Sequence, residues 1–212
     1  MASDADSAGA RQPQRQGQRP RLRQRLSVLL LRACGFRLVG EPPPLAKCVV
    51  VFAPHTSNWD FPLLILTRAA YGVRVHYLAK HTLFQPPFGA FFRWLGGIPV
   101  ERHRRRGLVG QAVRLLRERP HFWLAMAPEG TRARTDHWRT GFYRIARGAD
   151  VPLVCVFVDG ARRECGVCAV LTLSGDPAKD LEQLRSAYAG RRGLRPERAS
   201  EVRFRPGAIT SS

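Results

Sequence analysis

The sequence is poor in acidic residues. It has 16 aspartates and glutamates against 35 lysines and arginines, which gives a formal net charge of +19 at pH 7. A surface with this excess attracts anionic partners, such as phospholipid headgroups, nucleic acid, or acidic proteins and cofactors. Charge alone does not choose among these classes, but it makes an anionic phospholipid membrane surface one of the expected partners.

Long apolar runs are also lacking. No stretch approaches the ~20 apolar residues that are needed to span a bilayer. The best candidate, residues 27–31, ends at Arg32. This run is too short for the core of a signal peptide, and no small-residue cleavage site follows it. We therefore expect a cytoplasmic protein that is peripheral to the inner face of the cell membrane.

Cysteines are few and odd in number, with five in the chain. An odd count without an export signal argues against a disulfide framework. Cys165 and Cys168 have CxxC spacing, but neither a second pair nor a nearby histidine completes a zinc site. We therefore predict no metal centre.

Three segments differ in composition. Residues 1–20 lack large apolar side chains and predict a disordered basic tail. Residues 21–39 have arginines interspersed with apolar residues at helical spacing, namely Leu22, Leu26, Leu29, Leu30 and Ala33. This pattern predicts a basic amphipathic helix. Its apolar stripe packs on the domain, lies in a membrane interface with the arginines on headgroups, or does each in part. Residues 45–212 form the predicted folded domain.

Strand and helix patterns alternate along that domain. Apolar runs predict strands at residues 48–53, 73–79, 121–127, 151–158 and 167–173. Helical spacing predicts helices at residues 61–71, 88–95, 108–119 and 177–188. Repeated alternation of this kind favours a single α/β domain with a mostly parallel sheet flanked by helices.

Two polar segments directly follow predicted strands. Residues 54–60 follow the first strand, and residues 128–132 follow the strand at 121–127. In open α/β sheets, ligand sites form beyond the carboxyl ends of the strands. If these two strands are parallel neighbours, the two polar segments meet at one edge of the sheet.

His55 and Asp60 are the candidate catalytic pair. On an ideal helix, residues five apart differ by about 140°, so the two can touch only if His55 precedes a helix that holds Asp60 in its first turns. Asp60 would then accept a hydrogen bond from one imidazole nitrogen and leave the other free to take a proton. Such a pair can activate a substrate hydroxyl. The spacing alone also fits a strand end followed by an acidic first helical turn.

The order of four motifs resembles that of the glycerolipid acyltransferases of the lysophosphatidic acid (1-acylglycerol-3-phosphate) acyltransferase type. The H-x4-D motif is matched by His55 and Asp60. A glycine-initiated strand that ends in an acidic residue and an arginine is matched by residues 97–102, E-G-T-R by residues 129–132, and an apolar strand containing V-P by residues 151–154. The resemblance covers about residues 47–158.

This resemblance implies an activity. A fatty acyl group would move from an acyl thioester, either acyl-CoA or acyl carrier protein, to the hydroxyl of a phosphate-bearing glycerolipid such as lysophosphatidic acid. His55 would be the general base and Asp60 would orient it, with no acyl-enzyme and no cofactor beyond the thioester co-substrate. Arginines suit the acceptor phosphate. The implied acceptor residues are Arg102, Glu129, Gly130, Thr131 and Arg132. Apart from the resemblance, Lys80 at a predicted strand end and Arg139 after the E-G-T-R segment are further candidates for contact with the acceptor.

Two other functions use the same features. A nucleic-acid-binding protein could be built on the arginine clusters, but the sequence has no recognised nucleic-acid motif, and nucleic acid is not the expected partner. A lysolipid or thioester hydrolase could use the same His55/Asp60 pair. Product analysis separates hydrolysis from acyl transfer, because only transfer yields an acylated acceptor.

Overall fold

The computed structural model describes residues 21–100 and 105–209. Its strands are β1 (Arg37–Val39), β2 (Lys47–Phe52), β3 (Val75–Lys80), β4 (Gly97–Val100), β5 (Phe122–Met126), β6 (Leu153–Asp159) and β7 (Glu164–Leu171). Its α-helices are α1 (Leu22–Ala33), α2 (Asp60–Tyr71), α3 (Gly89–Trp94), α4 (Arg105–Glu118), α5 (Gly141–Ala149) and α6 (Pro177–Tyr188). Two 3-10 helices complete the described elements, η1 (His81–Phe84) and η2 (Pro196–Arg198).

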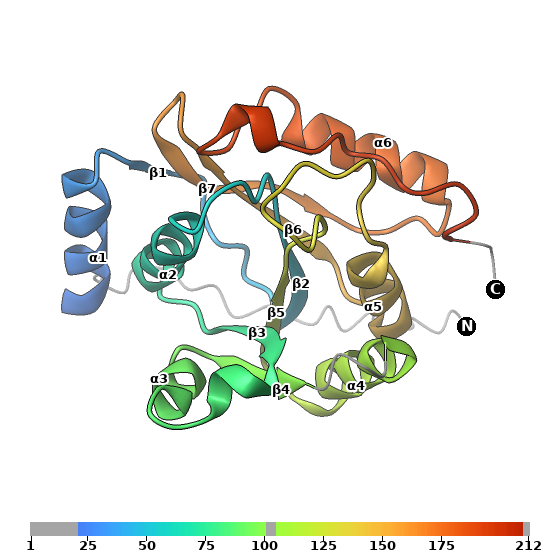
Figure 1. Cartoon of the computed structure of the whole chain (residues 1–212), viewed down its shortest axis with the longest axis horizontal. Coiled ribbons are helices and arrows are strands. Elements are labelled where there is room, and N and C mark those ends of the chain that lie inside the picture. The colour runs from blue at the N-terminus through green and yellow to red at the C-terminus, as the bar shows by residue number, and fades with distance from the viewer. Residues whose placement is uncertain (1–20, 101–104, 210–212) are drawn as a thin grey trace, which may run out of the picture.

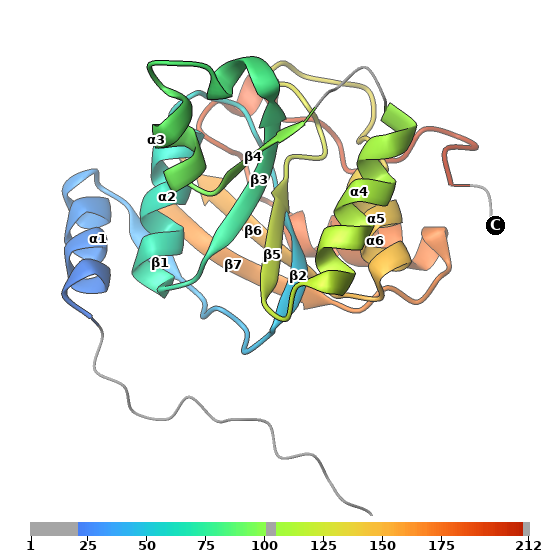
Figure 2. The ribbon, with the colours of Figure 1, turned by 90° about the horizontal axis from the view of Figure 1, so that it is seen from below.

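The strands form one sheet in the order β1-β7-β6-β2-β5-β3-β4. The strands from β6 to β4 in this order are parallel, whereas β7 is antiparallel to β6 and pairs in parallel with β1. The helices α1 and α2 cover one face of the sheet, and α4, α5 and α6 cover the other (Figures 1 and 2). An apolar core lies between the sheet and the helices on each face. The predicted α/β fold with a mostly parallel sheet is confirmed.

Strand β2 runs through the middle of this sheet, between β5 and β6. Val49 and Val51 point into the core under α4 to α6, and Val50 and Phe52 point into the core under α2. A strand buried on both faces needs apolar residues at consecutive positions, which explains the unbroken run in the sequence. Its carboxyl end delivers the next residues, including His55, to the edge of the sheet.

Most of the predicted elements are present, with bounds shifted by a few residues, and α6 coincides with the predicted helix at residues 177–188. Strand β1 and helix α5 were not among the predicted elements. The signal for α5 was available, because Phe142, Ile145 and Ala146 are buried and lie at helical spacing. Strand β1 has three residues and lies within the segment that was predicted as a helix.

The predicted helix at residues 21–39 is therefore too long. Helix α1 ends at Ala33, and Gly35 adopts a left-handed conformation with φ of +79°. Glycine reaches this conformation without the steric cost that a side chain brings, so the chain turns here and continues as β1. The basic tail that was predicted at residues 1–20 lies outside the described residues.

Helix α1 has two apolar sides. Ser27 and Leu31 are buried and face α2, as Figure 1 shows for the two helices. The stripe that the sequence singled out is on the opposite side, because residues four and seven apart share one side of a helix. Its leucines are between 44% and 83% exposed, namely Leu22, Leu26, Leu29 and Leu30. The interpretation in which this stripe packs on the domain is wrong.

Candidate functional site

The two polar segments meet at the carboxyl edge of the sheet, as predicted. Strands β2 and β5 are parallel neighbours, with Val51 opposite Met126, so the chain leaves both strands at the same edge. The backbone N–H of His55 donates a hydrogen bond to Glu129 Oε2 at 2.6 Å. The segment after β2 is thereby tied directly to the segment after β5.

His55 and Asp60 have the geometry that their spacing required. Asp60 is the first residue of α2, and His55 lies before the helix. His55 Nδ1 and Asp60 Oδ2 are 3.0 Å apart. When Nδ1 carries the proton and its N–H donates a hydrogen bond to the carboxylate, Nε2 is the basic nitrogen. The imidazole side chain is 17% exposed, and its ring packs edge-on against Phe52 with ring centroids 5.4 Å apart.

Asp60 also organises the turn that carries His55. Its Oδ2 accepts the backbone N–H groups of Thr56 and Ser57, each at 2.8 Å, in addition to the imidazole. The carboxylate is fully buried. Three donors on one oxygen fix the position of the turn relative to α2, so the imidazole is held by its own hydrogen bond and by its backbone.

Glu129 connects the loop after β2 with the loop after β5. Its side chain is 1% exposed. Oε2 accepts the N–H of His55, and Oε1 accepts the N–H of Ser200 at 3.4 Å. Both oxygens therefore face backbone donors, and the side chain positions the His55 loop. The resemblance had implied a contribution to the acceptor site, and the contacts indicate that any such contribution acts through the loop.

Glu129 is expected to make the stability of the protein depend on pH. Burial raises the pKa of its carboxyl to about 7, although the N–H groups of His55 and Ser200 lower it in part. The folded protein thus binds this proton more tightly than the unfolded chain, so the contribution of the group is complete below about pH 4.5 and is lost as the pH rises through 7. Relative to Glu129→Gln, the free energy of unfolding of the wild type should fall by about 2–3 kcal/mol between pH 5 and pH 8.

Urea unfolding of both proteins at several pH values measures this difference. Glu118→Gln is the matched control, because Glu118 is exposed on α4 and its removal should leave the pH profile unchanged. A difference between wild type and Glu129→Gln that stays constant from pH 5 to pH 8 would contradict the prediction.

The candidate acceptor residues surround this loop. Gly130 has φ of +66°, and a Cβ at this position would lie 2.8 Å from Arg139 Nε. The Arg139 guanidinium therefore packs against the turn at Gly130, in the space that a side chain at this position would occupy. Arg132 is exposed two residues further on, and Lys80 is exposed where β3 ends, at the same edge of the sheet. Within the described residues, none of these three cations pairs with a carboxylate.

Thr131 and Arg102 are the remaining predicted site residues. The Thr131 hydroxyl accepts the N–H of Ala133 at 3.3 Å, which shapes the turn after Gly130. Arg102, the other predicted phosphate ligand, lies outside the described residues.

The described part of the chain contains no cluster of three His, Cys, Asp or Glu side chains of the kind that holds a metal ion.

Sequence reasoning missed the part played by the C-terminal segment. The Thr56 hydroxyl oxygen accepts the N–H groups of Leu194 and Arg195, at 3.1 and 3.0 Å. Together with the bond from Ser200 to Glu129, these contacts hold the His55 loop from the side of residues 193–200, which cross the edge of the sheet in Figure 1. No sequence motif marks this segment, so its role could not be predicted.

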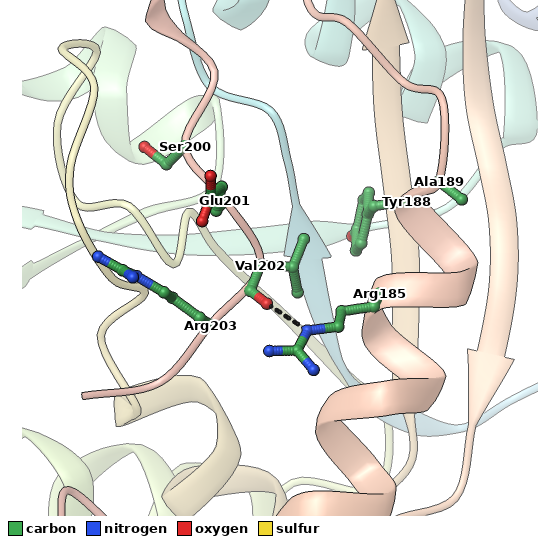
Figure 3. A pocket seen from close by; sticks show the side chains of 7 residues that line it. All are labelled: Arg185, Tyr188, Ala189, Ser200, Glu201, Val202 and Arg203. Atoms are coloured by element: carbon green, nitrogen blue, oxygen red, sulfur yellow. Dashed lines mark hydrogen bonds between the residues drawn. The ribbon is translucent and has the colours of Figure 1, made fainter. Parts of the chain in front are cut away.

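A cavity of about 380 Å³ lies on the far side of this segment, between it and α6 (Figure 3). It is lined by Arg185, Tyr188, Ala189 and residues 200–203. Arg185 Nε donates to the carbonyl of Val202 at 3.0 Å, which fastens the segment to α6. The cavity is not lined by His55 or Asp60, so it is separate from the candidate pair.

Comparisons with known proteins identify the family and the fold of the chain. A model of the Acyltransferase family matches residues 37–159, more than half of the chain. The fold is similar to the crystal structure of the 1-acyl-sn-glycerophosphate (LPA) acyltransferase PlsC from Thermotoga maritima, with a TM-score of 0.54 and 19% identity over 77% of this chain and 76% of that chain. No curated protein matches the sequence significantly. The residues matched by the family include His55, Asp60 and the segment 129–132, and they end before the C-terminal segment.

Proposed function

Because the chain belongs to the Acyltransferase family, we propose that it transfers a fatty acyl group from an acyl thioester to the hydroxyl of a phosphate-bearing glycerolipid. The donor would be acyl-CoA or acyl carrier protein, and lysophosphatidic acid would be an acceptor of the right kind. The observation that carries the proposal is the contact of 3.0 Å between His55 Nδ1 and Asp60 Oδ2, which leaves Nε2 as a base at the edge of the sheet.

The chemistry needs one base and one positive cluster. His55 Nε2 takes the proton of the acceptor hydroxyl while the oxygen attacks the thioester carbonyl. The carbon–sulfur bond then breaks, and the departing thiolate receives the proton from the imidazolium. The buried Asp60 carboxylate stabilises the imidazolium between the two steps. The acyl group passes directly to the acceptor, so the protein needs no nucleophile of its own.

The cations that pair with no carboxylate among the described residues suit a phosphate on the acceptor. Arg132 and Arg139 follow the same strand as Glu129, and Lys80 lies at the same edge. A guanidinium can bind two phosphate oxygens at once. The structurally similar protein from Thermotoga maritima is described as acting on 1-acyl-sn-glycerophosphate, which carries such a phosphate.

An acceptor panel tests the proposal. The purified protein is incubated with one labelled acyl-CoA and a set of lysolipids, with and without phosphate, while thiol release and lipid products are followed. We expect thiol release that depends on a phosphate-bearing lysolipid, and an acylated lysolipid as the product. Free fatty acid without an acylated acceptor would assign the site to hydrolysis, and thiol release by none of the mixtures would overturn the proposal.

Replacement of Arg132 should separate acceptors by their phosphate. We expect Arg132→Ala to raise KM for lysophosphatidic acid by about 10–100-fold, since a hydrogen bond to a charged group contributes roughly 1.5–3 kcal/mol. KM for a monoacylglycerol, which lacks the phosphate, should change little. Steady-state kinetics on both acceptors measure the effect, and Arg134→Ala, an exposed arginine two residues away, is the control. An equal rise in KM for both acceptors would assign Arg132 a role other than phosphate binding.

We further propose that α1 rests on an anionic phospholipid surface, at the inner face of the cell membrane. Its outward leucine stripe is flanked on one side by Arg25 and Arg32 and on the other by Arg23, all exposed. An apolar stripe between two basic margins is typical of helices that lie in a membrane interface. Helix α3, with Phe91 and Trp94 exposed, lies at the same end of the molecule (Figures 1 and 2). Within residues 21–100 and 105–209, no helix has the length and apolar character needed to cross a bilayer.

Charge placed in the leucine stripe should release the protein from vesicles. We expect the double variant Leu26→Asp/Leu29→Asp to bind phosphatidylglycerol vesicles at least about tenfold more weakly, because burying one leucine contributes roughly 1.5–3 kcal/mol. Vesicle sedimentation measures the binding. Val170→Asp is the control, since Val170 is a similarly exposed apolar residue outside α1. Equal sedimentation of the double variant and the wild type would show that α1 does not carry the contact.

A further inference from the structure

A second cavity lies beside the His55 loop, on the face of the sheet that α1 and α2 cover. We name it the α1–α2 pocket. It has a volume of about 340 Å³, and its lining residues are Cys34, Phe36, Ser57, Trp59, Leu63, Arg163, Leu194 and Arg195. Four parts of the chain contribute to it: the end of α1, the beginning of α2, the turn between β6 and β7, and the C-terminal segment. The E-G-T-R residues do not line it.

The lining combines an apolar wall with two arginines and contains no acidic residue. Phe36 and Leu63 are buried side chains of the wall, and Trp59 is 71% exposed at its rim. Arg163 and Arg195 are exposed, and within the described residues neither pairs with a carboxylate. The Arg163 guanidinium lies 5.6 Å from the centre of the Phe36 ring, so charge and apolar surface are in contact.

Two carboxylates near Arg163, those of Glu164 and Asp159, already have other partners. Glu164 pairs with Arg37 at 2.7 Å and with Arg191 at 3.5 Å. Asp159 is fully buried and accepts backbone N–H groups from residues 161, 162 and 192. In the part of the chain that the structure describes, the two guanidinium groups of the pocket thus have no carboxylate partner, and a ligand that brings negative charge would complement them.

We propose that the α1–α2 pocket binds an amphiphile with a phosphate and an acyl chain, holding the phosphate on Arg163 and Arg195 and the chain on the Phe36–Leu63 wall. The volume is at the lower end of the range for small-molecule sites, which fits a headgroup with the first part of one chain. The molecule could be an acyl-CoA or a phospholipid from the membrane under α1, because the stripe of α1 ends one residue before Cys34. Binding to the pocket is measured without acyl transfer, whereas the identification of a bound acyl-CoA as the acyl donor rests on the proposed function.

Cys34 reports on the occupancy of this pocket. It is the one exposed cysteine of the five. Burial raises the pKa of the other four thiols, which slows their reaction with alkylating agents. Alkylation of the full-length protein by N-ethylmaleimide, followed by intact-protein mass spectrometry, therefore measures access to the pocket. Octyl phosphate and octanoyl-CoA, each as a monomer below its micelle concentration, are the two probes, and octyl glucoside is the uncharged control.

We expect at least one of the two phosphate probes to slow the alkylation of Cys34 about fivefold or more at saturation, with octyl glucoside without effect. Arg195→Gln should raise the concentration for half-protection about tenfold, and Arg163→Gln/Arg195→Gln more than that. The single variant changes only the side chain, so the backbone bond from residue 195 to Thr56 persists. Arg162→Gln, in the same turn but outside the pocket, should behave as the wild type.

The pattern of protection identifies the source of the ligand. Stronger protection by octanoyl-CoA assigns the pocket to the acyl donor, and stronger protection by octyl phosphate assigns it to a membrane lipid. No protection by either probe, equal protection by octyl glucoside, or protection that survives in both arginine variants would overturn the proposal. The proposed function would be unaffected by that result, because the acceptor panel measures it separately.

Discussion

His55→Ala is expected to lower kcat for acyl transfer by about 10²–10⁴-fold, the range that a positioned general base contributes. In the proposed mechanism the variant lacks the imidazole that takes the acceptor proton, and no other described histidine contacts Asp60. The fold should remain, because the backbone N–H of residue 55 still reaches Glu129. Thiol release at saturating donor and acceptor measures kcat, and thermal unfolding checks the fold.

A second histidine provides the matched control for this result. His121 is exposed and precedes β5, at the opposite end of that strand from the candidate site. His121→Ala should therefore retain wild-type kcat. If His55→Ala is as active as the wild type, the general-base mechanism is wrong, whatever the products of the acceptor panel.

Asp60→Asn should lower kcat by about 10²–10⁴-fold with little change in KM for the acceptor. The amide oxygen can take the place of Oδ2 and accept the same three donors, while the amide nitrogen takes the place of Oδ1, which is buried without a partner among the described residues. The shape of the turn is thereby kept, but the negative charge that stabilises the imidazolium in the proposed mechanism is lost. The nitrogen left without a partner should reduce the free energy of unfolding by about 1–3 kcal/mol.

Asp159→Asn separates the loss of charge from the loss of stability. Like Asp60, Asp159 is fully buried and accepts backbone N–H groups. It is the last residue of β6 and has no histidine partner among the described residues. We expect a similar loss of stability with kcat within about tenfold of the wild type. Steady-state kinetics and urea unfolding of both variants provide the comparison. Parallel losses of kcat in the two variants would indicate that Asp60 acts through the fold alone.

The sequence predicted the part of the site that depends on local order along the chain. Strand β2 is recognisable because its buried residues are consecutive, and the five-residue spacing required His55 to lie before α2. Both expectations are confirmed by the structure. The resemblance to acyltransferases is confirmed by the family match over residues 37–159.

The remaining part of the site depends on contacts between distant segments. Thr56 is 138 residues from Leu194, and Glu129 is 71 residues from Ser200. The donors in these contacts are backbone N–H groups, which every residue except proline provides, so no side-chain pattern marks them. The length of α1 was overestimated for a related reason. Apolar and basic residues continue to Val39, and only the conformation at Gly35 decides where the helix ends.

The C-terminal segment has a consequence for how the protein is divided. A fragment cut to residues 37–159 would contain His55, Asp60 and the E-G-T-R segment, and by motif it would count as complete. It would lack the N–H groups of residues 194, 195 and 200, so the Thr56 hydroxyl and one oxygen of Glu129 would lose the donors that hold the loop. Local opening of such a segment requires less free energy than global unfolding. The loop that carries His55 is therefore held in place by a longer unit than the one that carries the signature residues.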